Sequence, residues 1–276
     1  MRYRHMVVVG VLVTGPASTL SAQRLWLTDD HAQVAGIEIA KGFFAQDNGF
    51  SPQFAGASSV ATVFGRVRLD SKLMVTAEIP FAHVEEEPLT IFSTRTRTTN
   101  TFGNPWIGIQ ADANPSTAIE VGFRPGLASD LDESAGQSLG ALLDFDHFDA
   151  WYSSATVFGA LVRAGRVPDR GLFTVGVVGG TFAFETSSNG PAYADYGLRV
   201  GERWPSVIAS LALSGHLILN QCSGCTIDER MVNQLAATVV SVRGRFQPEA
   251  GVRVFLDPSF RDYIKATAFV GTTLRF

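Results

Sequence analysis

Ser214 and His216 are the two residues whose types come nearest to a hydrolytic pair. A serine can serve as nucleophile when a histidine takes its proton and a third group orients that histidine. The two are separated by one residue and share one face of a predicted strand, opposite Leu213 and Leu217. That face is the polar one, which should line the inside of a barrel. A serine–histidine site that hydrolyses membrane lipid should instead lie on the outer, apolar face. We therefore expect no enzyme and no catalytic residue.

Cys222-Ser223-Gly224-Cys225 contains the only two cysteines of the chain. A Cys-x-x-Cys pair is used in redox sites, in halves of zinc sites and in small disulfides. No second pair and no histidine in the same predicted loop completes a zinc site, and no βαβ pattern surrounds the motif. Because exported proteins keep disulfides oxidised, we predict a disulfide between Cys222 and Cys225 at a loop tip.

Two acidic stretches carry side chains that can bind ions. Residues 144–149 read Asp-Phe-Asp-His-Phe-Asp, but they lack the glycine and the distal glutamate of a calcium loop. We expect them at the outer rim, where a polar loop meets an aromatic strand start, and predict no metal. Glu85-Glu86-Glu87, with Arg95 and Arg97 beyond it, is interpreted as a solvated loop; contact with lipopolysaccharide phosphates or divalent ions is the alternative.

Charged residues recur at every second position of several apolar segments. Ile119, Val121 and Phe123, for example, alternate with Glu120 and Arg124. Successive strand residues point to opposite faces, so the charges should share a face turned away from the apolar one. They form either a structural ladder of ion pairs or a charged constriction that selects solutes. The predicted inward charges are Arg66, Arg68, Glu78, Glu120, Arg124, Asp195, Arg199, Glu249, Arg253 and Lys265.

The elements that position these charges are about twelve strands separated by turns of alternating length. Short connections near 70–71, 112–115, 166–169, 203–205 and 243–245 alternate with long ones near 45–58, 83–101, 128–149, 184–192, 220–230 and 257–262. Short turns on one rim and long loops on the other are typical of a transmembrane barrel. The predicted strands are 33–44, 59–69, 72–82, 102–111, 117–127, 150–163, 171–183, 193–202, 206–219, 231–242, 246–256 and 263–276. Apolar residues occupy both faces of the predicted strands 33–44, 150–163 and 171–183. Either these three strands pack against an internal feature, or their predicted register is wrong.

Both chain ends point to export. Residues 1–22 combine a basic start, a short apolar run and a small residue before the expected cut, as secretory signal peptides do. Removing them takes Arg2 and Arg4 and leaves 20 basic against 26 acidic residues, a balance that does not favour nucleic acid. No later segment offers about 18 uninterrupted apolar residues for a spanning helix. An exported apolar chain of this kind is either a soluble β domain or a closed barrel, the form that satisfies every backbone hydrogen bond in lipid.

The C-terminal strand resembles the sorting signal of Gram-negative outer-membrane barrels, because the final Phe276 follows Leu274 and Val270 at alternate positions. The mature chain, 23–276, resembles the transporter and porin-like barrels. Residues 102–109, followed across a turn by 118–125, resemble the meta-pathway phenol-degradation barrel family. That resemblance implies passive uptake of small, often hydrophobic molecules. The His-x-Ser order of the outer-membrane phospholipase family is missing around Ser214.

We therefore predict an all-β protein, a single up-and-down antiparallel transmembrane β-barrel of about twelve strands in the Gram-negative outer membrane. The expected function is a passive channel or transporter for small solutes without a cofactor. A structural or surface-interaction barrel with a closed lumen is the first alternative, and an outer-membrane lipid-modifying enzyme is the second. Expected partners are outer-membrane lipid and lipopolysaccharide, the barrel-assembly machinery and a small solute, with no nucleic acid.

Overall fold

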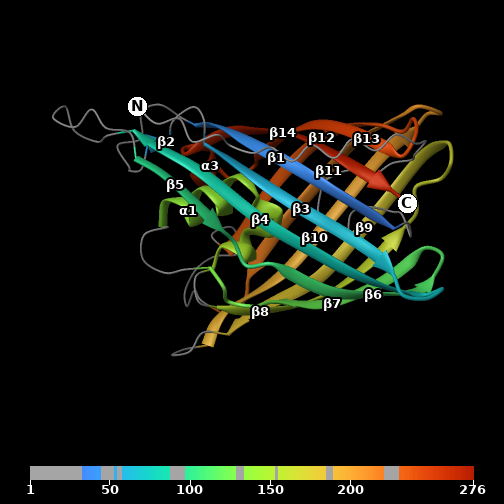
Figure 1. Cartoon of the computed structure of the whole chain (residues 1–276), viewed down its shortest axis with the longest axis horizontal. Helices are drawn as coiled ribbons and strands as arrows, with labels where there is room; N and C mark the ends of the chain where they lie inside the picture. The colour runs from blue at the N-terminus through green and yellow to red at the C-terminus, as the bar shows by residue number, and fades with distance from the viewer. Residues whose placement is uncertain are drawn as a thin grey trace, which may run out of the picture.

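The computed structural model describes residues 33–44, 53–54, 58–87, 97–128, 134–152, 155–184, 189–220 and 230–276. Within these ranges fourteen strands form one antiparallel sheet, in which β2 (Gln53–Phe54) and β5 (Arg97–Phe102) only extend the pairing of β4. The remaining twelve close into a ring, because β1 pairs with β14 and β4 pairs with β6 (Figure 1). They are β1 (Val34–Phe44), β3 (Ser59–Arg68), β4 (Leu73–Glu87), β6 (Trp106–Asn114), β7 (Thr117–Arg124), β8 (Thr156–Gly165), β9 (Gly171–Phe184), β10 (Asn189–Arg203), β11 (Val207–Ile218), β12 (Met231–Ser241), β13 (Phe246–Phe255) and β14 (Ile264–Arg275).

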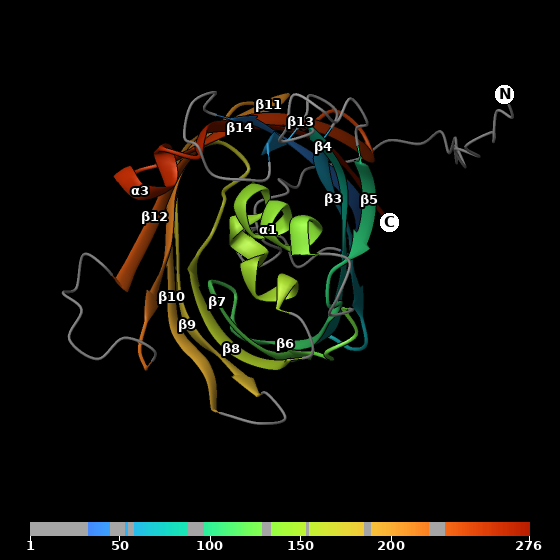
Figure 2. The same ribbon diagram turned by 90° about the vertical axis from the view of Figure 1, so that its left-hand side faces the viewer.

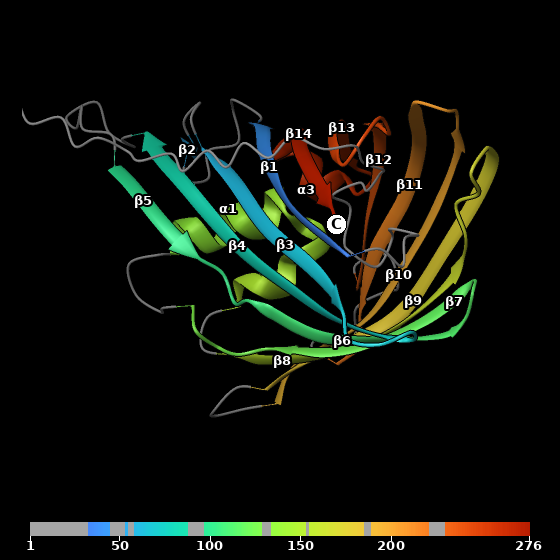
Figure 3. The same cartoon turned by 45° about the vertical axis from the view of Figure 1, so that its right-hand side comes forward.

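The predicted up-and-down barrel of about twelve strands is confirmed, and so is the sorting of its connections. The links after β3, β6, β8, β10 and β12 are short and lie at one end of the barrel. The longer links lie at the other end, where α3 (Pro258–Arg261) occupies part of the connection between β13 and β14. The two ends therefore differ in kind, as Figure 3 shows. Among the described helices none is both long and apolar enough to cross a membrane.

Alternation along the strands separates an outer apolar face from an inner polar one. Val121 of β7 is 51% exposed, whereas its neighbour Glu120 is 5% exposed. Val252 and Arg253 of β13 show the same contrast. Val270 and Phe276 are also exposed on the outside, and Leu274 is half-buried. Apolar side chains that face outward all round a closed sheet suit a lipid environment.

The main departure from the predicted fold is a segment folded into the lumen. Residues 128–149 were predicted to be a long loop, but α1 (Ser134–Leu143) and η1 (Phe145–Trp151) lie inside the ring of strands (Figure 2). Leu139, Leu143 and Trp151 are buried against the inner faces of the strands. The strand predicted to start at 150 starts at Thr156, because this apolar packing holds residues 145–151 inside. We call residues 134–152 the plug.

Two strands with apolar residues on both faces are explained by internal packing. In β1, Ala40 belongs to the apolar cluster that holds the plug. In β9, Phe173 and Val175 pack with Ile208 and Val240 in a separate cluster, which Val242 and Val167 complete near the short turns. The plug thus lies in the lumen against one set of apolar side chains, and a second set lines the barrel near the short turns.

Several predictions concern residues outside the described ranges. The signal peptide of residues 1–22, the Cys222–Cys225 disulfide and Arg95 all lie there. The solvated loop predicted at Glu85-Glu86-Glu87 is wrong, because these residues continue β4, where Glu86 stands opposite Arg97 of β5. The role of the terminal Phe276 as an assembly signal remains a prediction.

Candidate functional site

Eight of the ten predicted inward charges are buried inside the barrel, namely Arg66, Glu78, Glu120, Arg124, Asp195, Arg199, Glu249 and Arg253. The other two, Arg68 and Lys265, are exposed. Arg68 is the last residue of β3, where the strand runs into a short exposed turn. Lys265 has no partner residue in β1, because Phe43 pairs with Ala266 and Phe44 with Ile264. This bulge shifts the alternation, so strict parity misplaced Lys265.

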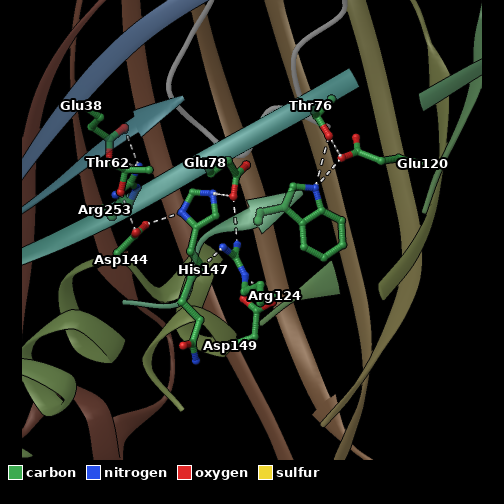
Figure 4. A network of polar contacts seen from close by, with 12 residues as sticks. Glu38, Thr62, Thr76, Glu78, Glu120, Arg124, Asp144, His147, Asp149 and Arg253 are labelled. Carbon is green, nitrogen blue, oxygen red and sulfur yellow. Dashed lines mark hydrogen bonds and ion pairs between the residues drawn. The ribbon is translucent and has the colours of Figure 1, made fainter. Parts of the chain in front are cut away.

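Arg124 joins the barrel wall to the plug. Its Nε donates to Oδ2 of Asp149 at 2.9 Å, and its Nη2 donates to Oε2 of Glu78 at 2.9 Å (Figure 4). Nη1 donates to the backbone oxygen of Asn104 at 3.1 Å. Asp149 belongs to η1, whereas Glu78 belongs to β4. The guanidinium therefore bridges a carboxylate of the plug and a carboxylate of the wall, all three groups being buried.

His147 is the second polar link between plug and wall. Its Nδ1 lies 2.6 Å from Oδ1 of Asp144, and its Nε2 lies 3.3 Å from Oε2 of Glu78. Burial opposes the charged imidazolium, but the two carboxylates outweigh burial and raise the pKa of His147 to about 10. Burial likewise opposes ionisation of Asp144, yet the imidazolium and a hydrogen bond from Thr62 (2.9 Å) hold the pKa of Asp144 below its usual value.

The stretch 144–149 therefore anchors the plug, and its predicted place at the outer rim is wrong. The chain turns inward here because its three carboxylates and one imidazole find partners on the lumen wall. Among the described residues no group of three or more His, Cys, Asp or Glu is arranged to hold a metal ion.

Ser214 and His216 also bind the plug. Ser214 Oγ donates to Oδ1 of Asp146 at 2.9 Å. His216 contacts Oδ1 of Asp195 through Nδ1 and the backbone oxygen of Phe145 through Nε2, the latter at 3.1 Å. The described contacts include no hydrogen bond between the serine and the histidine, and both face the lumen as predicted. Their geometry fits the seating of η1.

Asn104 was missed by sequence reasoning as a functional residue. Phe81 of β4 pairs with Phe102, and Glu78 of β4 pairs with Trp106. Between these two pairs β4 has two residues, 79–80, whereas the facing chain has three, 103–105. The extra residue bulges the wall. Asn104 donates to the backbone oxygens of Ala150 and Tyr152, each at 2.6 Å, and its Oδ1 accepts from the backbone nitrogens of Leu127 (2.7 Å) and Ala128 (2.8 Å). It thus holds both chain segments that enter and leave the plug.

Glu38 and Glu120 have different partners from one another. Glu38 binds Arg253 through both carboxylate oxygens, at 2.7 and 2.9 Å. In Glu120, by contrast, Oε1 accepts from Thr76 Oγ1 (2.6 Å) and from Trp106 Nε1 (2.8 Å). Both of these donors are neutral, and Oε2 has no hydrogen-bond partner.

Aromatic rings cover the side of η1 that faces β10 to β13. Phe148 contacts Tyr193 with ring centroids 4.7 Å apart and His216 at 4.3 Å, and Phe145 contacts Phe255 at 5.1 Å. Phe255 stacks on Phe260 of α3 at 4.9 Å. The plug is therefore held by buried ion pairs and by edge-on and tilted aromatic contacts with the wall.

No family model matches the chain, and no curated protein matches its sequence, so the resemblance to the phenol-degradation family remains a prediction. Solved structures match its fold. The COG4313 outer membrane channel from Pseudomonas putida F1 is 11% identical with a TM-score of 0.54, covering 96% of this chain and 100% of that one. LpxR from Salmonella typhimurium is 9% identical with a TM-score of 0.53, covering 88% and 100%. The NanC porin is 6% identical with a TM-score of 0.50, covering 87% and 100%. The fold is that of the outer-membrane β-barrels.

Proposed function

We propose that this protein is a passive outer-membrane channel for small solutes, closed in this structure by the plug and opened when η1 leaves its seat. The fold supports the membrane part of the proposal. The observation that carries the channel part is the polar seat of η1, in which Arg124 bridges Asp149 and Glu78.

Buried ion pairs stabilise the interior of a barrel no better than apolar side chains do. Taking charges out of water costs free energy that the pair only partly regains, and apolar side chains of similar volume are often as stabilising or more so. A seat of charged groups has a different advantage, because each group regains its hydration when the plug moves and water enters. A polar seat thus lowers the cost of opening relative to an apolar one.

The two halves of the plug are held differently. Leu139 and Leu143 of α1 pack into an apolar cluster with Ala82 and Val84 of β4. η1 shares this cluster through Trp151, but it also reaches the wall through the charged side chains of Asp149, His147 and Asp146. Exposure of the cluster to water would cost about 25 cal/mol per Å² of apolar surface. Because α1 carries no charged side chain that would regain hydration, we assign the movement to η1 and keep α1 docked on β4.

The rings beside η1 support a solute with an apolar body. Phe148 and Phe260 are half-buried at the long-loop end, whereas Tyr193 and Phe255 are buried there. Small apolar or aromatic solutes stack on such rings, while the charged groups below would slow a bare ion. Small, apolar, uncharged molecules are accordingly the proposed substrate class.

Replacement of the plug tests this function. Arg124 pairs with Val157, so a short glycine-serine turn can join β7 to β8 in place of residues 128–152. The expected result in planar bilayers is brief openings for the wild type and steady conductance for the plug-less variant. Liposomes that contain the plug-less variant should likewise take up small aromatic solutes faster than liposomes that contain the wild type. A folded, heat-modifiable plug-less barrel with no conductance would contradict the proposal.

A barrel with a permanently closed lumen is the second candidate. It is favoured by the burial of the inward charges and by the apolar cluster of Phe173, Ile208 and Val240 near the short turns. The plug-less variant separates the two candidates, because that cluster would still block a structural barrel after the plug had been removed.

A further inference from the structure

A groove runs across the outer face of β9 to β13, the strands on the right-hand side of Figure 3. Its volume is about 840 Å³, which lies within the range of ordinary ligand pockets. Leu211 and Val252, which line it, are 51% and 45% exposed, so the groove opens towards lipid and not into the lumen. It is therefore separate from the plug and from the charges that seat η1.

The groove exists because alanines alternate with larger side chains across neighbouring strands. Ala237 of β12 stands between Leu211 of β11 and Val252 of β13. Two more alanines that line the groove, Ala209 and Ala250, belong to the next row of outward side chains towards the short turns. A methyl group reaches less far than the side chain of valine or leucine, so the outer surface is hollow at these three positions.

Apolar packing alone does not make such a groove select one lipid over another. In a bilayer the surrounding tails are as apolar as the groove, so no hydrophobic driving force chooses its occupant. An acyl chain seated in the groove gains many small dispersion contacts, whichever headgroup it carries. Selection between lipids must therefore come from a polar group at the edge of the groove.

Glu202 supplies this polar group. It lines the groove on the outer face of β10, between Leu172 of β9 and Ala209 of β11. The residue is half-buried, and the contacts among the described residues give its carboxylate no cationic partner. An ionised carboxylate on a lipid-facing surface is unfavourable unless a cation neutralises it. The edge of the groove therefore favours a lipid that brings a positive charge.

The depth of Glu202 matches the headgroups of the leaflet beside the short turns. Trp204, two residues further along the same outward series, is 43% exposed, and Phe246 at the start of β13 is 55% exposed. Aromatic side chains of this kind mark the boundary between hydrocarbon and headgroups. Two residues span about 7 Å along a strand, and less in depth because barrel strands are tilted. Glu202 thus lies within reach of a headgroup on the short-turn side, which is the periplasmic side of such barrels.

We propose that this groove binds one phospholipid of the periplasmic leaflet that carries a primary ammonium, of the phosphatidylethanolamine class. One acyl chain lies along Ala209, Ala237 and Ala250, and the ammonium binds the carboxylate of Glu202. A primary ammonium offers three N–H donors, and its bonds to a carboxylate are charge-assisted. The choline headgroup has no N–H donor, and phosphatidylglycerol has no cationic group, so both match Glu202 less well.

Native mass spectrometry of the purified full-length barrel, released from nanodiscs, tests this site without reference to transport. The nanodiscs contain equal amounts of phosphatidylethanolamine, phosphatidylcholine and phosphatidylglycerol with identical acyl chains. The wild type should retain one lipid, with phosphatidylethanolamine in several-fold excess over each of the others. Glu202→Gln should lose this headgroup preference and still retain lipid. Ala237→Phe should retain less of all three lipids, because the ring fills the groove.

Two variants outside the groove are the matched controls. Asp169→Asn removes an exposed acid from a short turn and should keep the headgroup preference, and Ala160→Phe enlarges an exposed alanine of β8 and should keep lipid retention. If Ala237→Phe does not form a heat-modifiable barrel, wild-type protein is cross-linked to phosphatidylethanolamine that carries a photoreactive acyl chain, and the label should map to β10 to β13.

Several results would overturn the proposal. They are equal retention of the three lipids by the wild type, no retained lipid, an unchanged preference in Glu202→Gln, and a label spread evenly around the barrel. A lipid-free dimer as the main species would also overturn it and would assign the groove to a second copy of the chain.

Discussion

Substitution of Asp149 is the most direct way to loosen the plug. Asp149 Oδ2 accepts a hydrogen bond from Arg124 Nε at 2.9 Å, and both side chains are buried. Asp149 is the residue of the plug that Arg124 joins to the barrel wall. Hydrogen bonds to charged groups contribute about 1.5–3 kcal/mol. Each 1.36 kcal/mol changes an equilibrium tenfold, so Asp149→Ala should raise the ratio of open to closed channel roughly 10- to 150-fold.

Asp149→Asn provides a graded comparison. The amide keeps a neutral acceptor at the same place, and neutral bonds are about half as strong as charge-assisted ones. Its open-to-closed ratio should therefore rise by roughly 4- to 13-fold, between those of the wild type and Asp149→Ala. Open probability in planar bilayers is the measurement. Asp169→Asn, an exposed acid in the short turn between β8 and β9, should leave it unchanged.

The reasoning fails on either of two results. If both variants form heat-modifiable barrels with wild-type open probability, the Arg124 bridge does not hold the channel closed. If Asp149→Asn opens the channel as much as Asp149→Ala, the charge of the carboxylate is not what seats η1.

Three further predictions address pH, the lipid face and assembly. Because the pKa of His147 is raised to about 10, its charged form stabilises the closed plug fully below pH 6.5, and this stabilisation is lost as pH rises through about 10. The open probability of the wild type should therefore increase over that pH interval. His147→Gln should be more open than the wild type at neutral pH and should not show this pH response. Val121→Arg and Val252→Arg should each lower the free energy of unfolding in lipid by roughly 2–4 kcal/mol, as measured by urea titration. Leucine at these two exposed outer positions should be tolerated. Equal tolerance of arginine and leucine would contradict the assignment of this face to lipid. Deletion of Phe276 should reduce the amount of heat-modifiable barrel in the outer-membrane fraction, and an unchanged amount would show that the terminal aromatic is not part of the assembly signal.

The sequence by itself determined the ring of strands and the direction of most side chains. A strand exposes alternate residues to opposite faces, so Glu120 and Val121 had to point to different environments once β7 was recognised. Short turns and long loops alternate along the chain, which places them at opposite ends of an up-and-down barrel. These are local properties of period and length, and they required no knowledge of partners distant in sequence.

The plug, by contrast, was decided only by tertiary contacts. α1 has no acidic residue in its first turn and no basic residue in its last, so little in residues 134–143 marks a helix. From sequence, the acidic stretch 144–149 was placed at the outer rim, and only the fold brings Thr62, Glu78 and Arg124 of the strands to it. None of these partners is adjacent in sequence to the segment that it holds.

Two local irregularities also escaped the sequence. The extra residue at Lys265 reversed the alternation at the start of β14, and the bulge at Asn104 turned a wall residue into the tie between the two ends of the plug. A bulge changes parity by one residue without altering the apolar pattern on either side of it, so alternation alone does not reveal it. Which carboxylate meets which cation was likewise decided only by closure of the barrel, because ring closure fixes the distances across the lumen.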